Sequence, residues 1–408
     1  MKKTIVFATL AIICLAGLSS GLYYYLLTKE PASPEHVPPA NDLDRFNLPA
    51  GILSNDTILG SLKLSGDYML SHIQKNGKWD YEYDPLKDKV LSTYNVLRHA
   101  GATYCLALIF KYTQDLDYYN GTVSTLDYLI SKFMVYENKG GIEIGYLQED
   151  GMVKLGGAAL ALLAIVEVEK LDPEANYDRE MNALGNFVLM MQQDSGRFLC
   201  FYKLNEDQHN DFYPGEALLA LSRLYDHTKD ERYLDALSLG LSYYNDYYKA
   251  GLYTAYTPWA TEANVYAYGW LKNASYLDIS YRMAVSCASG QWTPETAPDP
   301  LYIGGFSPEP SSNLASRMEG VVDAYLLAKR NGEASRQAEF LPHLQYTALV
   351  LMNLQLNATD VAGMPDPDDA LGGTPLTYSD LTIRIDYVQH AVVVLAKIMR
   401  YQYSNDSV

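Results

Sequence analysis

The feature that most constrains this chain is a repeated unit that starts near residue 52. Each unit has an amphipathic helix, a short segment with Gly and aromatic residues, and a second helix that is rich in Ala and Leu. We count six units, and such regular repetition indicates a repeat architecture. The helix pairs are predicted at 56–75 with 91–113, 118–136 with 155–170, 176–193 with 214–227, 230–248 with 259–271, 274–288 with 313–330, and 334–356 with 382–402.

The two helices of each unit differ in how their apolar residues are distributed. The second helix is more uniformly apolar, as in residues 158–164 and 392–396. A helix that is apolar all round must be enclosed, so the second helices are expected to form an inner ring and the first helices an outer ring. This predicts an all-α fold, an (α/α)6 toroid over residues 51–403. An open solenoid is the alternative, but the polar starts of the inner helices favour a closed ring with one functional mouth.

Residues 1–27 carry a targeting signal. Lys2 and Lys3 precede an apolar run over residues 5–27 that is long enough to cross a bilayer as a helix. The positive end should stay in the cytoplasm. We therefore expect a single-pass signal-anchor in the cell membrane, with the C-terminal domain extracytoplasmic. A cleaved signal peptide, with its small-residue site within residues 16–21, is the alternative.

The flanking segments and the polar motifs fit an exported domain. Residues 28–50 are rich in Pro and polar residues, which indicates an extended tether, and residues 404–408 form a short tail. The three cysteines of the repeat region, Cys105, Cys200 and Cys287, are far apart and indicate neither a disulfide framework nor a zinc site. Asn-x-Ser/Thr sequons, which are compatible with glycosylation, occur at Asn55, Asn120, Asn273, Asn357 and Asn405.

The charge and the motif content exclude several classes of function. The formal net charge is −18, and phosphate binding needs a basic surface, so nucleic acid is not expected as a partner. The sequence has no Gly-rich phosphate loop, no metal-ligand spacing and no Ser or Cys nucleophile motif, so we expect no cofactor and no metal. The 36 tyrosines offer ring faces for sugar stacking, although the composition suits ordinary half-buried packing even better.

Two phrases carry a resemblance to a known superfamily. Residues 213–220 read Tyr-Pro-Gly-Glu-Ala-Leu-Leu-Ala, and residues 228–234 read Thr-Lys-Asp-Glu-Arg-Tyr-Leu. With the repeat, they make residues 52–403 resemble the six-hairpin glycosidases and their relatives, the N-acylglucosamine 2-epimerases and glucuronyl C5-epimerases. The resemblance implies the fold more strongly than any one reaction. It also implies that inverting hydrolases on this fold take two carboxyls from different inner-helix starts, and that the epimerases use paired histidines.

The inner-helix starts should surround the mouth of the ring. Closure makes the first and last units neighbours, so Arg98 and His99 are expected beside Arg384, Asp386 and His390. Asp386 and His390 are four residues apart and share one helix face. This is the densest group of titratable residues in the sequence and predicts a functional pocket. The alternative is structural, with Asp386 and His390 joining the first and last hairpins and the arginines only clamping carboxylates.

Two chemistries remain open for this pocket, together with a non-enzymatic role. Glycoside hydrolysis needs one protonated and one ionised carboxyl, for which we select Glu216 and Asp386, with Asp80 third. Epimerisation needs a base and an acid on opposite faces of the sugar, for which His99 and His390 are suited. The third possibility is a glycan-binding or surface-assembly protein that lost catalysis.

The remaining polar and aromatic groups near the mouth are expected to bind the substrate. Arginines would hold an anionic group, and rings would stack on sugar, although each ring could equally be a packing residue. We therefore expect a membrane-anchored, carbohydrate-active protein, a glycoside hydrolase-like enzyme before the alternatives. The predicted binding residues are Trp79, Tyr83, Tyr94, Asn95, Arg98, Tyr213, Trp259, Glu262, Glu319, Arg384 and Tyr387.

Overall fold

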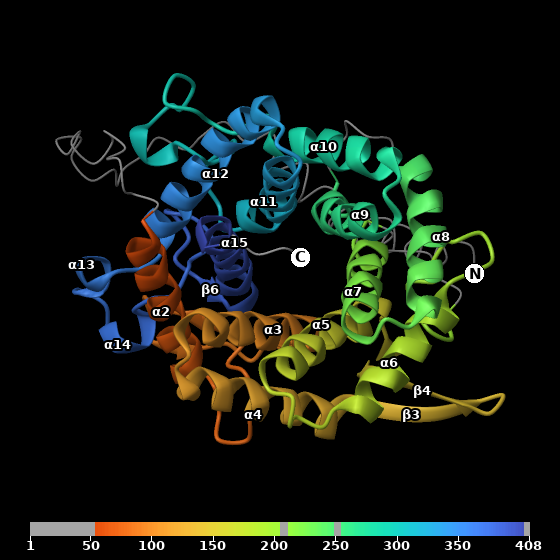
Figure 1. The fold of residues 1–408 in the computed structure, drawn as a ribbon. Coiled ribbons are helices and arrows are strands. Elements are labelled where there is room, and N and C mark those ends of the chain that lie inside the picture. Colours follow the sequence, from red (N-terminus) through yellow and green to blue (C-terminus); the bar gives the residue numbers. More distant parts are fainter. Residues whose placement is uncertain (1–53, 205–210, 249–253, 404–408) are drawn as a thin grey trace, which may run out of the picture.

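The computed structural model describes residues 54–204, 211–248 and 254–403, and these form two concentric rings of helices (Figure 1). The outer ring contains α2 (Asn55–Ser71), α4 (Leu116–Phe133), α6 (Asp178–Met191), α8 (Glu231–Tyr247), α10 (Ala274–Ala288) and α12 (Ala334–Leu354). The inner ring contains α3 (Val96–Thr113), α5 (Leu155–Leu171), α7 (Tyr213–Thr228), α9 (Thr257–Leu271), α11 (Leu314–Arg330) and α15 (Ile385–Tyr403).

The inner ring is closed. Each inner helix packs on the next one along the chain, and α15 packs on α3 to complete the circle. The predicted (α/α)6 toroid is therefore confirmed, and the open solenoid is excluded. The inner helices are buried over most of their length, with the apolar stretch Leu155–Val168 of α5 as the clearest case, as expected for helices that are enclosed on all sides.

Two small sheets depart from the all-helical prediction. β3 (Met134–Lys139) and β4 (Ile142–Glu149) form an antiparallel hairpin that β5 (Met152–Val153) extends. The helix predicted to reach residue 136 ends at Phe133, because the following residues pair with β4 and the chain then turns at Gly140 and Gly141, both at positive φ. Only glycine adopts that backbone at low cost.

The second sheet joins the two ends of the repeat. β1 (Glu82–Asp84) pairs with β2 (Lys89–Val90) and with β6 (Ile383–Arg384), which leads directly into α15. The pairing sets Tyr83 opposite Ile383, and the Ile385 amide donates to the Tyr81 carbonyl at 3.0 Å. The start of the last inner helix is thus fixed against the first unit.

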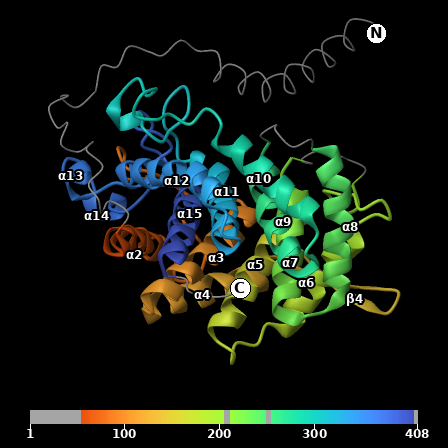
Figure 2. The same cartoon turned by 45° about the horizontal axis from the view of Figure 1, so that its top comes forward.

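Long connections occur in the last two units. Between α12 and α15 the chain contains two short helices, α13 (Ala358–Val361) and α14 (Pro367–Ala370). Between α10 and α11 it contains one 3-10 turn, η2 (Pro300–Tyr302), and this connection projects beyond the helices (Figures 1 and 2). Both connections run from the end of an outer helix to the start of an inner one, so they lie on the side of the ring where the inner helices begin.

Glutamines at the ends of three outer helices make the same contact. Each side-chain amide donates to the carbonyl of the glycine that turns the chain inward, and also to a group on the following outer helix. The pairs are Gln192 with Gly196, Gln291 with Gly304, and Gln355 with Gly372. Since Gln355 also bonds Ser61 and Ser65 of α2, the same contact closes the outer ring.

The turn glycines lie against the following outer helix. Gly372 has a φ of +84°, and a Cβ there would lie less than 3.0 Å from the Leu64 carbonyl oxygen of α2. Gly77, Gly196 and Gly304 repeat this arrangement against the next outer helices. These positions therefore require glycine both for the backbone angle and for the space.

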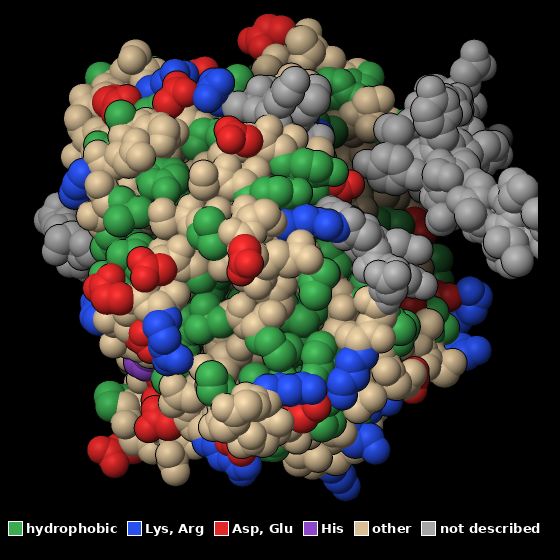
Figure 3. All heavy atoms as spheres, turned by 90° about the vertical axis from the view of Figure 1, so that its right-hand side faces the viewer, with side chains coloured by type: hydrophobic (Ala, Val, Ile, Leu, Met, Phe, Trp, Pro, Cys, Tyr) green, Lys and Arg blue, Asp and Glu red, His purple; other side chains and the backbone are tan. Residues whose placement is uncertain are grey.

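The outer surface beside α8 is mixed in character. Lys and Arg side chains are interspersed there with Asp and Glu and with hydrophobic groups (Figure 3). Among the described residues no helix is long and apolar enough to span a membrane. The predicted anchor (1–27), tether (28–50) and tail (404–408) lie outside the described residues.

We predict that Gly372→Ala destabilises the fold more than Gly332→Ala. Gly332 also has a positive φ, of +70°, but a Cβ there would meet nothing within 4 Å. Gly332→Ala should therefore cost only about 1 kcal/mol for the left-handed backbone. Gly372→Ala should cost about 1–3 kcal/mol more, because the new methyl group overlaps α2. Urea unfolding of both variants measures the difference, and equal losses would contradict the role of Gly372 in ring closure.

Candidate functional site

The site begins where α15 starts. Arg384, the last residue of β6, donates two hydrogen bonds to Asp386 in the first turn of α15, from Nε at 2.9 Å and from its terminal nitrogen at 2.6 Å. Arg98 of α3 approaches the same carboxylate, with its Nε 3.4 Å from Oδ2. The structure therefore brings together the two arginines and the aspartate, as closure of the ring predicts.

Asp386 is held in its ionised form. Its burial raises the pKa of the carboxyl, but Arg98 and Arg384 outweigh the burial and hold the pKa below its ordinary value. The arginine side chains are 30% and 28% exposed, whereas that of Asp386 is 5% exposed. The guanidinium groups are therefore the accessible part of this cluster.

Aromatic rings pack against Arg384 from two sides. The guanidinium lies 4.5 Å from the ring centre of Tyr387 and 5.5 Å from that of Tyr81. Tyr81 was not among the predicted site residues, whereas Tyr83, two residues along, was. The Tyr83 hydroxyl instead donates to Asp88 at 3.1 Å, and its ring packs on His72.

Glu216, in the first turn of α7, is the second buried carboxyl. Burial raises the pKa of Glu216 to about 7, although Arg98 and His390 act to lower it. Its Oε2 has no hydrogen-bond partner within the described parts of the chain. A buried carboxyl without a partner favours its neutral form. Near neutral pH Glu216 can therefore carry a proton, whereas Asp386 is ionised.

The space for Glu216 is provided by a glycine on the neighbouring helix. A Cβ at Gly156 of α5 would lie less than 3.0 Å from Glu216 Oε2 and from the Tyr213 ring. At the adjacent Gly157 the nearest atom to a Cβ would be 3.7 Å away. The carboxyl therefore occupies the position that a side chain at residue 156 would need.

His390 completes the group of residues at the mouth. Its Nδ1 lies 2.7 Å from Oε1 of Glu319 on α11, and the Trp259 ring of α9 stands edge-on at 6.2 Å between ring centres. All three residues are buried. His390 acts to lower the pKa of both Glu216 and Asp386, which places the imidazole near both carboxyls.

His99 does not join this group, contrary to the prediction. Its Nδ1 lies 2.8 Å from the Tyr94 hydroxyl and its Nε2 lies 2.8 Å from the Thr125 carbonyl of α4. Burial lowers the pKa of His99 to about 4. Consecutive helical residues point about 100° apart, so Arg98 faces the mouth while His99 faces the outer ring. The predicted pairing of His99 with His390 is therefore wrong.

The other predicted residues of the first unit are engaged in structural contacts. Trp79 is buried against His99, and Asp80 accepts a hydrogen bond from Gln74 at 2.6 Å. Asn95 caps α3 by accepting from the Leu97 and Arg98 amides. These residues, with Tyr83 and Tyr94, have structural partners between the outer and inner helices. The segment that connects an outer helix to the next inner helix contacts the outer layer before it reaches the mouth.

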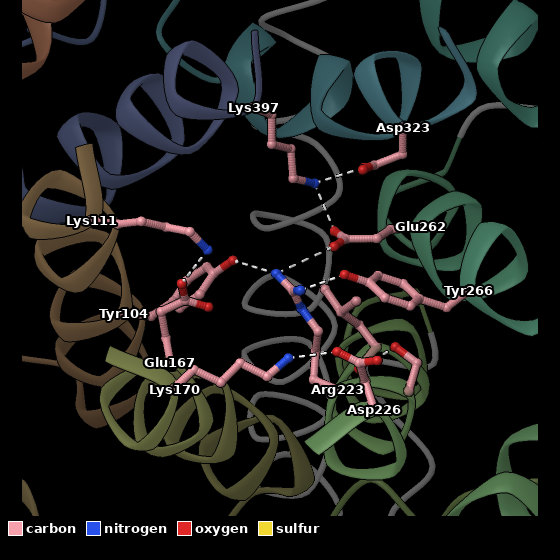
Figure 4. A network of polar contacts seen from close by, with 12 residues as sticks. Tyr104, Lys111, Glu167, Lys170, Arg223, Asp226, Glu262, Tyr266, Asp323 and Lys397 are labelled. Atoms are coloured by element: carbon pink, nitrogen blue, oxygen red, sulfur yellow. Dashed lines mark hydrogen bonds and ion pairs between the residues drawn. The ribbon is translucent and has the colours of Figure 1, made fainter. Parts of the chain in front are cut away.

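Glu262 belongs to a second polar cluster inside the ring. It accepts a hydrogen bond from Lys397 at 2.6 Å and lies 3.7 Å from Arg223, while Lys397 also contacts Asp323 at 2.8 Å (Figure 4). Glu262 is thus paired within the core, contrary to its predicted place in the pocket.

This core network links all six inner helices. Lys111 pairs with Glu167 at 2.8 Å, and Lys170 pairs with Asp226 at 2.6 Å (Figure 4). The cations Lys111, Lys170, Arg223 and Lys397 balance the carboxylates Glu167, Asp226, Glu262 and Asp323. Buried charges need such pairing. The signal that could have revealed the network is Lys397, a lysine within an apolar helical run.

One acidic cluster with metal-ligand spacing lies outside the ring. Carboxylate oxygens of Asp88, Asp366 and Asp369 lie within 4.8 Å of one another, between the β1–β2 turn and α14. Asp88 is exposed and the other two are partly buried. Exposed acidic groups commonly gather without an ion, so this cluster does not enter the site.

Comparison with known proteins defines the fold. The sequence matches no family model and none of the curated proteins. The chain has the six-hairpin toroid fold. Similar solved structures include an inactive variant of the GH76A α-1,6-mannanase of Salegentibacter sp. HEL1_6 in complex with α-1,6-mannotriose, at 14% identity and a TM-score of 0.61, with 85% of this chain and 99% of that chain covered.

Two further solved structures share the fold, and their names give other activities. D-mannose isomerase is 13% identical with a TM-score of 0.63, covering 86% of this chain and 99% of that chain. An unsaturated glucuronyl hydrolase specific for heparin is 8% identical with a TM-score of 0.62, covering 86% of this chain and 98% of that chain. Since one fold hosts several reactions, the residues at the mouth have to distinguish between them.

The burial of Glu216 predicts a pH-dependent stability. Because folding raises its pKa from about 4.5 to about 7, the neutral form stabilises the fold below about pH 4.5, and this stability is lost as the pH rises through 7. The loss should reach about 3 kcal/mol. The Glu216→Gln side chain cannot ionise, so its free energy of unfolding should fall less than that of the wild type over the same rise in pH.

Urea unfolding at about pH 5 and about pH 8 measures this effect. Glu174→Gln, at an exposed position, serves as the control and should keep the wild-type difference between the two pH values. If Glu216→Gln also kept that difference, Glu216 would not be buried in the way described.

Proposed function

We propose that this protein hydrolyses glycosidic bonds in a glycan, with Glu216 as the general acid and Asp386 as the ionised carboxylate. The observation that carries the proposal is a pair of buried carboxyls whose pKa values are shifted in opposite directions, to about 7 for Glu216 and below the ordinary value for Asp386. Glycoside hydrolysis requires such a pair. Sugar-acting proteins with the same fold support it.

The proposed reaction uses both carboxyls in one step. The proton of Glu216 passes to the leaving glycosidic oxygen as the bond to the anomeric carbon breaks. A water attacks that carbon from the opposite face and gives its proton to Asp386. Although Arg384 occupies one position on each Asp386 oxygen, a carboxylate has about four lone-pair sites, so it can still accept from water.

The substrate class follows from the groups around the carboxyls. Trp259, Tyr213 and Tyr387 supply aromatic surface near the site. Arg98 and Arg384, the partly exposed members, can bind sugar hydroxyls or the carboxylate of a uronic acid. The mannanase and the glucuronyl hydrolase that share the fold suggest α-1,6-mannooligosaccharides and unsaturated uronides as first test substrates.

An isomerase or epimerase is the second candidate. It is favoured by His390, which Glu319 contacts, and by the D-mannose isomerase that shares the fold. It is weakened by His99, whose two nitrogens are both engaged away from the mouth. A non-catalytic glycan-binding role is weakened by Glu216, because a buried carboxyl without a partner is costly to keep for binding alone.

The proposed location is the outer face of a cell membrane. The apolar run at residues 5–27, the positive residues before it and the Pro-rich segment 28–50 support a domain that is tethered outside the cytoplasm, and the sequons support glycosylation. Protease protection of the full chain in sealed membranes tests the orientation, and a chain without residues 1–27 should lose its membrane association.

Substitution of either carboxyl should greatly slow hydrolysis. Glu216→Gln and Asp386→Asn should each lower kcat/KM by about 10²–10⁴-fold, the usual contribution of a general acid or base. His99→Gln should lower stability but leave kcat/KM within a few-fold, since His99 faces the outer ring. Reducing-end release from the oligosaccharides measures the rate.

The same assay separates the candidate functions. Exchange of solvent deuterium into recovered sugar without new reducing ends would favour the epimerase. Activity of the wild type should fall as the pH rises through about 7, because Glu216 then loses its proton. A hydrolase whose activity survived Glu216→Gln would contradict the assignment of the acid.

The neighbouring glycines give a sharper test of Glu216. Gly156→Ala should displace the carboxyl and lower kcat/KM by about 10²-fold or more, since small displacements of catalytic groups have effects of this size. Gly157→Ala, one residue along the same helix, has room for the methyl group and should leave the rate unchanged. Equal activities of the two variants would show that the Glu216 position is not critical.

A further inference from the structure

The contact between His390 and Glu319 is a buried pair that the proposed hydrolysis does not yet use. The two residues lie in the second turns of α15 and α11, and their side chains are 10% and 5% exposed. Only 2.7 Å separates His390 Nδ1 from Glu319 Oε1. With Glu319 as a carboxylate, which accepts and does not donate, the proton of this hydrogen bond is on Nδ1.

The other ring nitrogen, Nε2, is the atom that a ligand could reach. His390 Nε2 forms no hydrogen bond within the described segments of the chain. His390 follows Asp386 by one helical turn on the same face of α15, and its ring lies near enough to Glu216 and Asp386 to influence the pKa of both. In the neutral ring with Nδ1 protonated, Nε2 carries a lone pair and can only accept.

Glu319 lies near the positive charge of Lys397. Burial lowers the pKa of Lys397, but Asp323, Glu262 and Glu319 outweigh it and raise the pKa above its ordinary range. The Lys397 ammonium therefore stays charged near Glu319. A carboxylate in this setting is a fixed acceptor for Nδ1–H, and such an outer partner is what sets the tautomer of a functional histidine.

We propose that Glu319 is a positioning residue that fixes His390, so that Nε2 accepts a hydrogen bond from a hydroxyl of the sugar held between Glu216 and Asp386. This rests on the proposed function for the identity of the ligand. The arrangement of the histidine is independent of it and can be tested without substrate.

Nitrogen NMR of the full chain labelled with ¹⁵N-histidine tests the tautomer. The chain has only 7 histidines, and loss of a signal pair in His390→Gln assigns His390. At about pH 8, above the ordinary range of histidine, we expect protonated Nδ1 and unprotonated Nε2. The opposite tautomer, or protons on both nitrogens, would overturn the proposal whether or not the protein hydrolyses glycans.

Variants of Glu319 test the positioning role. Glu319→Gln keeps a carbonyl acceptor and should keep the wild-type tautomer, whereas Glu319→Met removes the acceptor and should give a mixture of tautomers. Glu167→Met, which removes a buried carboxylate from the distant pair with Lys111, is the matched control and should leave the His390 signals unchanged. A wild-type spectrum of His390 in Glu319→Met would overturn the proposal.

Kinetics on a hydrolysed oligosaccharide complete the test. Glu319→Met and His390→Gln should each raise KM about tenfold, the value of one hydrogen bond to a neutral group, and the double variant should raise it no further. Glu319→Gln should restore KM to within a few-fold of the wild type. Losses that add in the double variant would show that the two residues act independently. If no glycan is cleaved, the hydrolase proposal fails while the NMR result still decides the positioning role.

Discussion

The structure depends on the closure of α15 against α3. This contact is reinforced at the mouth by the pairing of β1 with β6 and by the approach of Arg98 to Asp386. A ring of helix pairs without it would expose the apolar faces of its first and last units, at about 25 cal/mol for each Å² left in water. Closure also unites residues that lie almost 300 positions apart, so the site cannot exist in a partly assembled ring.

A closed ring creates a second constraint, because much of its bore is removed from water. A buried charge on a bore-facing position needs a partner there. Most do, in the network around Arg223 and Lys397 and in the pair of Asp386 with Arg384. Within the described residues Glu216 Oε2 has no such partner, and burial in a low dielectric raises the pKa of Glu216 so that it can keep its proton. The same enclosure thus gives two similar carboxyls opposite states.

The sequence predicted the features that depend on local helix periodicity or on the repeat. Helix periodicity placed the helix ends within a few residues, and ring closure correctly brought Arg98 to Asp386. The β3–β4 hairpin was missed because its first residues continue the apolar pattern of α4. His99 was misplaced because spacing along the chain gives the height of a residue on the ring axis, whereas the direction of its side chain depends on the rotation of the helix.

The rotation of an inner helix is given by its few polar residues and by the partners that their side chains contact. On α15 the polar residues Asp386, His390 and Lys397 recur at intervals of four and seven, and all three have partners on the bore side, at Arg98, Glu319 and Glu262. On α15 such a polar stripe therefore marks the face toward the axis. On α3, His99 and Thr103 are also four residues apart, but both bond to Thr125 of the outer helix α4. The spacing shows that polar residues share a face, and their partners show which way that face points.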